Sequence, residues 1–186
     1  MRSLAEKPIR RIVTVDGDDG APIALHDGPG CVLHDPARPG FANIRVWATD
    51  QTPARALDLE RATRLAATLA APPGGSAFRI LVVPPDAGWS SAIDAPAVRA
   101  YFEAAGSPTA WAGGPDAPHP YMQKTATLDL CVILEGEVTL VLDTEEVPLA
   151  AGDSVVQRGT RHAWSNRASQ PCVIAVSSHD AEPLAG

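Results

Sequence analysis

The segment Leu128–Asn166 constrains the fold of this chain most strongly, because it breaks into short apolar runs separated by turn-forming residues. The runs are Leu130–Leu134, Val138–Leu142 and Val155–Val156, and the turn-forming residues are Glu135–Gly136, Asp143–Glu146 and Ala151–Asp153. Short β-branched runs at this spacing are typical of an antiparallel sandwich or barrel. A helix does not fit between these breaks.

The remainder of the chain repeats this strand pattern and adds two helical stretches. We expect strands over residues 10–15, 23–25, 43–49, 77–83 and 172–177, an irregular segment over 28–40 and a loop over 107–120. Leu57, Arg61, Leu65 and Leu69 recur at four-residue steps, which predicts a helix over 54–71 that stops at Pro72. A second short helix is expected over 95–105. The pattern therefore predicts an all-β fold with one or two short helices.

Composition excludes several classes of function. The 186 residues carry a formal net charge of −7 and no basic stripe, which argues against nucleic-acid binding. No apolar run approaches the roughly 20 residues that a membrane span needs, and the first residues lack the apolar core of a secretory signal. The three cysteines, Cys31, Cys131 and Cys172, form no CxxC pair. We expect a cytoplasmic protein with reduced thiols.

Two spacings stand out within the central segment. Asp129 is separated from Gly136 by six residues, and Gly152 is followed by Gln157-Arg158-Gly159 and then by His162-x3-Asn166. These spacings resemble the two motifs of the cupin family, in the form of a single-domain RmlC-like cupin with degenerate metal-binding motifs. In the family, Glu-x6-Gly closes the first motif, and the second runs from a Gly through Pro-x-Gly to His-x3-Asn. The resemblance implies a jelly-roll β-barrel and, by analogy with other cupins, a homodimer. We expect one domain over 1–186, with extra strands, helices and loops over 1–118 and the motif core over 119–179.

The same resemblance assigns the positions at which cupins hold a metal. With a three-residue spacer they carry Gln123, Thr125, Asp129 and His162, and with a four-residue spacer Met122 and Lys124 replace the first two. Strand alternation favours the first set, because it keeps Gln123, Thr125 and Asp129 on one inward face, together with Thr127, Cys131 and Ile133. One imidazole and one carboxylate are few ligands for a transition metal, so no cofactor is expected. His119 would complete a two-His, one-carboxylate set if it folded inward; otherwise it is an exposed loop residue.

Without a metal, His162 and Asp129 form an acid/base pair inside the barrel. His162 titrates near neutrality, and Asp129 is expected to orient it or to act as a base itself. Gln123, Thr125 and Asn166 are expected to hydrogen-bond a small-molecule substrate, and Ile133 and Trp164 to form apolar walls. This set predicts a lyase- or isomerase-type enzyme that catalyses dehydration, isomerisation, cyclisation or lactone opening on an oxygenated substrate. The alternative is that Asp129 and His162 are a hydrogen-bonded polar pair that remains from a lost metal site and has no catalytic role.

Two other functions remain open from the sequence. The first is a metal-dependent cupin dioxygenase or hydrolase that recruits His119 or Gln123 to the metal. The second is a non-catalytic cupin that binds a small ligand without turnover. Stoichiometric metal favours the first, and a filled pocket without chemistry favours the second.

Overall fold

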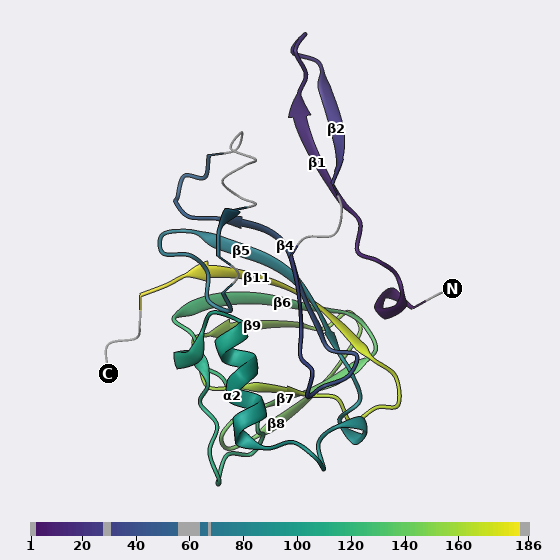
Figure 1. Ribbon diagram of the computed structural model, residues 1–186, viewed down its shortest axis with the longest axis vertical. Coiled ribbons are helices and arrows are strands. Elements are labelled where there is room, and N and C mark those ends of the chain that lie inside the picture. Colours follow the sequence, from purple (N-terminus) through teal and green to yellow (C-terminus); the bar gives the residue numbers. More distant parts are fainter. Residues whose placement is uncertain (1–2, 28–30, 56–63, 67, 183–186) are drawn as a thin grey trace.

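Two facing sheets build the body of the protein, and a third, two-stranded ribbon projects from it (Figure 1). The computed structural model describes residues 3–27, 31–55, 64–66 and 68–182. The larger sheet has the order β3 (Cys31–His34), β4 (Ala42–Thr49), β5 (Ser76–Val83), β11 (Cys172–Asp180), β6 (Thr127–Glu135) and β9 (Ser154–Arg158). The smaller sheet has the order β10 (Ala163–Ser165), β7 (Glu137–Val141) and β8 (Glu146–Ala150). The ribbon pairs β1 (Arg11–Asp16) with β2 (Pro22–Asp27). The predicted all-β jelly-roll barrel is confirmed.

Strand β11 joins the N-terminal strands to the central segment of the sequence. It pairs antiparallel with β5 on one side, where Val176 lies opposite Arg79. On its other side it pairs with β6, where Ser178 lies opposite Asp129. The strands β3 to β5 therefore extend the sheet that contains the motif residues, whereas β1 and β2 form the projecting ribbon.

Side chains of β6 alternate as the period of two predicts. The buried set is Thr127, Asp129, Cys131 and Ile133, and the intervening exposed set is Leu128, Leu130, Val132 and Leu134. The inward face meets the smaller sheet through an apolar core that includes Val138, Leu140 and Ile174. This alternation places the motif residues inside the barrel.

Helix α2 (Ala95–Ala104) closes one side of the barrel and confirms the expected helix. It begins at Asp94, whose side chain accepts a hydrogen bond from the backbone N–H of Ala97 at 2.9 Å. Its buried residues join an aromatic cluster composed of Phe41, Trp89, Tyr101, Phe102 and Tyr121. Single turns of 3₁₀ helix lie at η1 (Leu4–Glu6), η2 (Asp86–Gly88) and η3 (Pro108–Ala110).

Three local expectations need correction. The segment 28–40, expected to be irregular, contains β3, which pairs with β4 at the edge of the sheet. Strands β8 and β10 were not expected, because Pro148 interrupts the strand pattern of β8 and β10 is only three residues long. Half of the helix expected over 54–71, namely 56–63 and 67, lies outside the described residues; of the other half, Arg64 is helical, whereas 54–55, 65–66 and 68–71 are not.

Two surface features bear on partners. Within the described part of the chain, no helix is long and apolar enough to cross a membrane. The outward face of β6 and the neighbouring Val156 of β9 expose a row of apolar side chains. The homodimer expected from the family resemblance stays a prediction.

Gly136 connects β6 to β7 in a conformation that only glycine adopts without strain, with φ at +81°. A Cβ atom there would lie 2.7 Å from the carbonyl oxygen of Pro171, whereas at Gly152, with φ at +100°, it would meet open space. We expect Gly136→Ala to lower the free energy of unfolding by about 2–3 kcal/mol and Gly152→Ala by about 1 kcal/mol. Urea denaturation of both variants measures the difference, and equal losses would contradict the steric argument.

Candidate functional site

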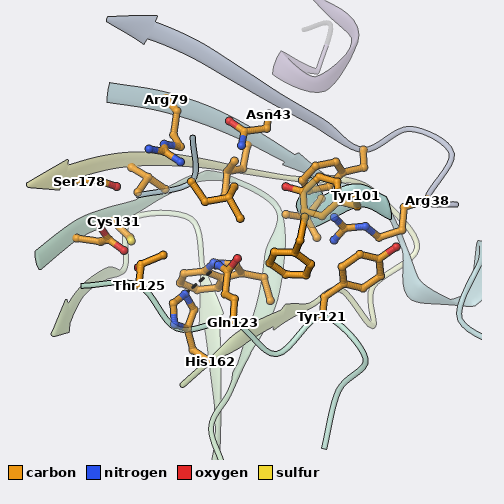
Figure 2. Close-up of a pocket in the computed structure, with 18 residues that line it drawn as sticks. Arg38, Asn43, Arg79, Tyr101, Tyr121, Gln123, Thr125, Cys131, His162 and Ser178 are labelled. Atoms are coloured by element: carbon orange, nitrogen blue, oxygen red, sulfur yellow. Dashed lines mark hydrogen bonds between the residues drawn. The ribbon is translucent and has the colours of Figure 1, made fainter. Parts of the chain in front are cut away.

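A cavity of about 60 Å³ lies inside the barrel between the two sheets (Figure 2). Its polar lining consists of Arg38, Asn43, Arg79, Gln123, Thr125, Asp129, His162 and Ser178. Its aromatic lining consists of Phe41, Tyr101, Phe102, Tyr121 and Trp164. About one probe sphere, or 10–15 Å³, holds a water molecule, so this cavity accepts about five heavy atoms. The site therefore fits a small molecule or one end of a larger one.

His162 is held in one tautomer by its surroundings. Its Nδ1 lies 2.9 Å from the carbonyl oxygen of Thr160, which can only accept, so Nδ1 carries the hydrogen. Nε2 then carries the lone pair and accepts from the side-chain amide of Gln123 at 3.2 Å. Burial lowers the pKa of His162, while the Thr160 carbonyl and the charge of Asp129 oppose this effect. His162 is therefore a neutral imidazole whose basic nitrogen faces Gln123.

The backbone fixes Gln123 and His162 against each other. The Gln123 N–H donates to the carbonyl of His162 at 2.8 Å, and the His162 N–H donates back to the carbonyl of Gln123 at 3.0 Å. Trp164 adds an edge-on ring contact, 5.9 Å from the centre of the imidazole. This exchange, together with the bridge between Gln123 and Trp111, positions the side chain of Gln123 against His162.

Asp129 lies on the inward face of β6 and is only 8% exposed. Its Oδ1 atom is buried and has no hydrogen-bond partner among the residues that the structure describes. Cys131, two residues along the strand, is kept protonated: burial, and then the charge of Asp129, raise the pKa of its thiol to about 12. Cys131 is therefore unsuited to act as a nucleophile. The expected orienting of His162 by Asp129 is corrected, because the Thr160 carbonyl holds the ring.

The structure brings together five of the predicted site residues: Gln123, Thr125, Asp129, Trp164 and His162 all line the cavity. Thr125 is also hydrogen-bonded to Thr127, with 2.7 Å between their hydroxyl oxygens. Met122 and Lys124, the pair that the four-residue spacer selects, do not line the cavity. Met122 packs against Val141 and Ala163, and Lys124 is exposed. The three-residue spacer is therefore the one consistent with the structure.

Ile133 and Asn166 lie away from the cavity lining. Ile133 is 1% exposed and packs in the core between the sheets. The Asn166 amide donates to the carbonyls of Val83 at 2.8 Å and Gln170 at 2.9 Å, and its Oδ1 accepts from the backbone N–H of Ala168 at 3.0 Å. Because the side chain of Asn166 is used to close the turn before β11, its expected role in substrate binding is corrected to a structural one.

His119 is neither exposed nor part of the cavity lining, which corrects both expectations for it. It is 7% exposed, its ring lies edge-on to Trp89, and its Nδ1 accepts the backbone N–H of Tyr121 at 3.1 Å. Burial lowers the pKa of His119 to about 4, and the positive charge of Arg38 adds to the effect. His119 is thus a neutral structural residue at the aromatic cluster.

The residues present do not fit a transition-metal site. Among the residues that the structure describes, no three His, Cys, Asp or Glu side chains come together as a ligand set. At the positions of the family ligands, Gln123 and Thr125 offer only weak neutral oxygens, and the Gln123 amide already donates to the lone pair of His162. No step of the chemistry proposed below passes through a metal.

Sequence reasoning missed two arginines that line the cavity. Arg38 donates from Nε to Asp35 at 2.8 Å, and its guanidinium lies 3.5 Å from the ring centre of Tyr121. Asp35 also accepts from the Tyr121 hydroxyl at 2.7 Å. Arg79 occupies the middle of the apolar strand over 77–83, and that single charge among aliphatic residues was the signal available in the sequence.

The lowered pKa of His119 makes the stability of the protein depend on pH. The unfolded chain binds a proton at this histidine below pH 6.5, and the folded chain does so only near pH 4. Stability present above pH 6.5 is therefore lost as the pH falls to 4, by about 3 kcal/mol for His119. We expect His119→Asn to remove this part of the loss in urea denaturation between pH 7 and 4. A difference between wild type and variant that is constant with pH would contradict the assignment.

Residues 110–178 match the family model of the cupin domain. Phomopsin biosynthesis cluster protein C' of Diaporthe leptostromiformis is 51% identical over 47 residues, which are 25% of this chain and 25% of that protein. Oryzines biosynthesis cluster protein J of Aspergillus oryzae is 44% identical over 48 residues, which are 25% of this chain and 27% of that protein. The matched segment thus spans about a quarter of the length of these curated relatives.

Solved structures of low sequence identity are also similar. A Cupin 2 conserved barrel domain protein from Salinispora arenicola is 17% identical, with 57% of this chain and 64% of that chain covered and a TM-score of 0.35. The Cnp3 cupin domain of Schizosaccharomyces pombe is 8% identical, with 92% and 87% covered and a TM-score of 0.43. The match over residues 110–178 contains both motif segments and the cavity residues His162, Asp129 and Gln123, so this part of the chain is similar to the cupin domain.

Proposed function

We propose that this protein is an enzyme that moves protons on a small oxygenated organic molecule without a metal, in a dehydration, isomerisation, cyclisation or lactone opening. The observation that carries the proposal is that one cavity is lined by both a basic imidazole nitrogen, on His162, and a buried carboxylate oxygen, on Asp129, that has no hydrogen-bond partner among the described residues. Buried polar atoms without partners are rare in folded proteins and are common where a ligand supplies the missing contact. The relatives named for phomopsin and oryzines biosynthesis clusters support a role in making a small molecule.

His162 is the proton carrier in this proposal. Its neutral form accepts a proton from substrate at Nε2 once the Gln123 amide turns to the ligand, and Nδ1–H remains on the Thr160 carbonyl. The imidazolium that forms is stabilised by the negative charge of Asp129, which raises the pKa of His162 against the effect of burial. Oδ1 of Asp129 is available to accept a hydrogen bond from a substrate hydroxyl.

Substitution of the two groups tests the assignment. In a screen of hydroxy acids, enol-forming carbonyl compounds and lactones, we expect His162→Gln and Asp129→Asn each to lower kcat by about 10²–10⁴-fold, because a positioned acid/base group contributes that much. The exposed neighbour Lys124 provides a control, and Lys124→Ala should keep full activity. Circular dichroism verifies that each variant folds. Full activity in folded His162→Gln would refute the role, and ligand binding without turnover would favour the non-catalytic cupin.

Elemental analysis separates this proposal from a metal-dependent reaction. Because one imidazole and one carboxylate bind a transition metal weakly, we expect protein purified without chelator to hold well under one equivalent of Fe, Mn, Ni, Cu or Zn. Activity should also survive dialysis against EDTA. A full equivalent of one metal that withstands desalting, and that His162→Gln abolishes, would overturn the metal-independent mechanism.

A further inference from the structure

Arg79 is a buried cation whose hydrogen-bonding groups are not satisfied by the protein. The residue is 5% exposed, and its Nε and Nη2 atoms are buried and have no hydrogen-bond partner in the part of the chain that the structure describes. It projects from β5 into the cavity, on the side opposite His162 and Gln123 in Figure 2. Burial disfavours the charged guanidinium and lowers its pKa, and an Arg side chain nonetheless stays protonated in proteins. A charge in this position costs stability unless a partner completes it.

Asp129 attracts Arg79 but does not pair with it. The two residues lie on β5 and β6, on either side of β11, opposite Val176 and Ser178 respectively. Two strand spacings of about 4.8 Å each and an offset of two residues along the strands separate their backbones. The attraction of Asp129 therefore opposes the effect of burial on the pKa of Arg79, while Oδ1 of Asp129 and two nitrogens of Arg79 stay unpartnered.

A second buried arginine in the same cavity shows how this chain satisfies such a group itself. Arg38 is 6% exposed, donates to Asp35 at 2.8 Å and lies over the rings of Tyr121 and Phe41 at 3.5 and 3.8 Å. Arg79 has neither a hydrogen-bonded carboxylate nor a stacked ring among the described contacts. Its guanidinium therefore faces the cavity with hydrogen-bond donors that a ligand can use.

We propose that the ligand of this cavity is a small carboxylic acid whose carboxylate binds Arg79, an inference that rests on the proposed function. Guanidinium nitrogens match the two oxygens of a carboxylate in a bidentate pair. The cavity accepts about five heavy atoms, which suits a short acid or the acidic end of a larger molecule. Asp129 already places one negative charge in the cavity, which disfavours a dianion such as phosphate.

The carboxylate anchor assigns a second task to Arg79 in proton transfer. When the Cα–H bond of a bound β-hydroxy acid breaks, the proton passes to Nε2 of His162 and the electron pair moves toward the carboxylate. Arg79 stabilises this additional negative charge. The electron pair then forms the Cα–Cβ double bond as the Cβ–O bond breaks, and the hydroxyl leaves with the proton from Nε2 as water. Atoms and charge balance, and His162 returns to its neutral form.

Three probes of five heavy atoms each test the charge preference directly by calorimetry: sodium propionate, propionamide and inorganic phosphate. We expect propionate to bind at least tenfold more tightly than propionamide, because hydrogen bonds to a charged group are stronger than neutral ones. It should also bind more tightly than phosphate. In the wild-type protein, equal binding of propionate and propionamide, or tighter binding of phosphate than of propionate, would overturn the inference without any variant.

Variants locate the anchor. Arg79→Gln should abolish the preference for propionate over propionamide, and Arg79→Lys should retain part of it because the charge remains and the bidentate geometry is lost. Arg158→Gln, at an exposed arginine of β9, is the matched control and should keep the full preference. A preference that survives in folded Arg79→Gln would refute the assignment.

The binding measurement also separates this inference from the proposed function. Folded His162→Gln should still prefer propionate, since Arg79 does not depend on the proton carrier. Carboxylate selectivity in a protein without turnover would leave the inference standing and refute the enzymatic proposal. Turnover of neutral substrates by a protein that does not prefer propionate over propionamide would support the enzymatic proposal and refute the inference.

Discussion

The backbone pairing of β11 with both β5 and β6 is the constraint on which the cavity depends. This one strand makes the N-terminal strands and the central segment of the chain into a single sheet. Because side chains alternate along every strand, the registers of the two ladders decide which residues of β5 and β6 share the inner face. A slip of one residue on either side of β11 would turn Arg79 or Asp129 outward, and the cavity would lose its charge.

The parts of the site that were predicted from the sequence are those that follow from local spacing. The period of two along β6 places Asp129, Thr125 and Gln123 on the inward face, and the second motif identifies His162. All four residues line the cavity. Arg79 could not be found in this way, because its place opposite His162 depends on a strand pairing between distant segments. His119 and Asn166 were misplaced for a related reason, because contacts with other segments position them. The His119 ring lies edge-on to Trp89, and the Asn166 amide donates to the carbonyl of Val83.

The charged residues that line the cavity are of two kinds: some have partners within the protein and others do not. Around Arg38, the protein itself provides the partners: Asp35 accepts from the guanidinium Nε and from the Tyr121 hydroxyl, and aromatic rings cover the cation. Such a network holds the loop before β4 in place. Around Arg79 and Asp129, the groups are buried but incomplete. Local inconsistency of this kind in an otherwise well-satisfied structure is expected at functional sites, where the binding partner is not part of the chain.

Half of the cavity wall comes from residues before the matched cupin domain, among them Phe41, Tyr101 and Phe102, and the other half from within it. The imidazole and the carboxylate belong to the second half, whereas most of the aromatic wall belongs to the first. Drift in the N-terminal segment can therefore reshape the space around a ligand while the reacting groups stay where the barrel holds them. Homologues that keep the motif segment but replace the first hundred residues, Arg79 among them, would inherit the imidazole and the carboxylate and acquire a new range of molecules on which to use them.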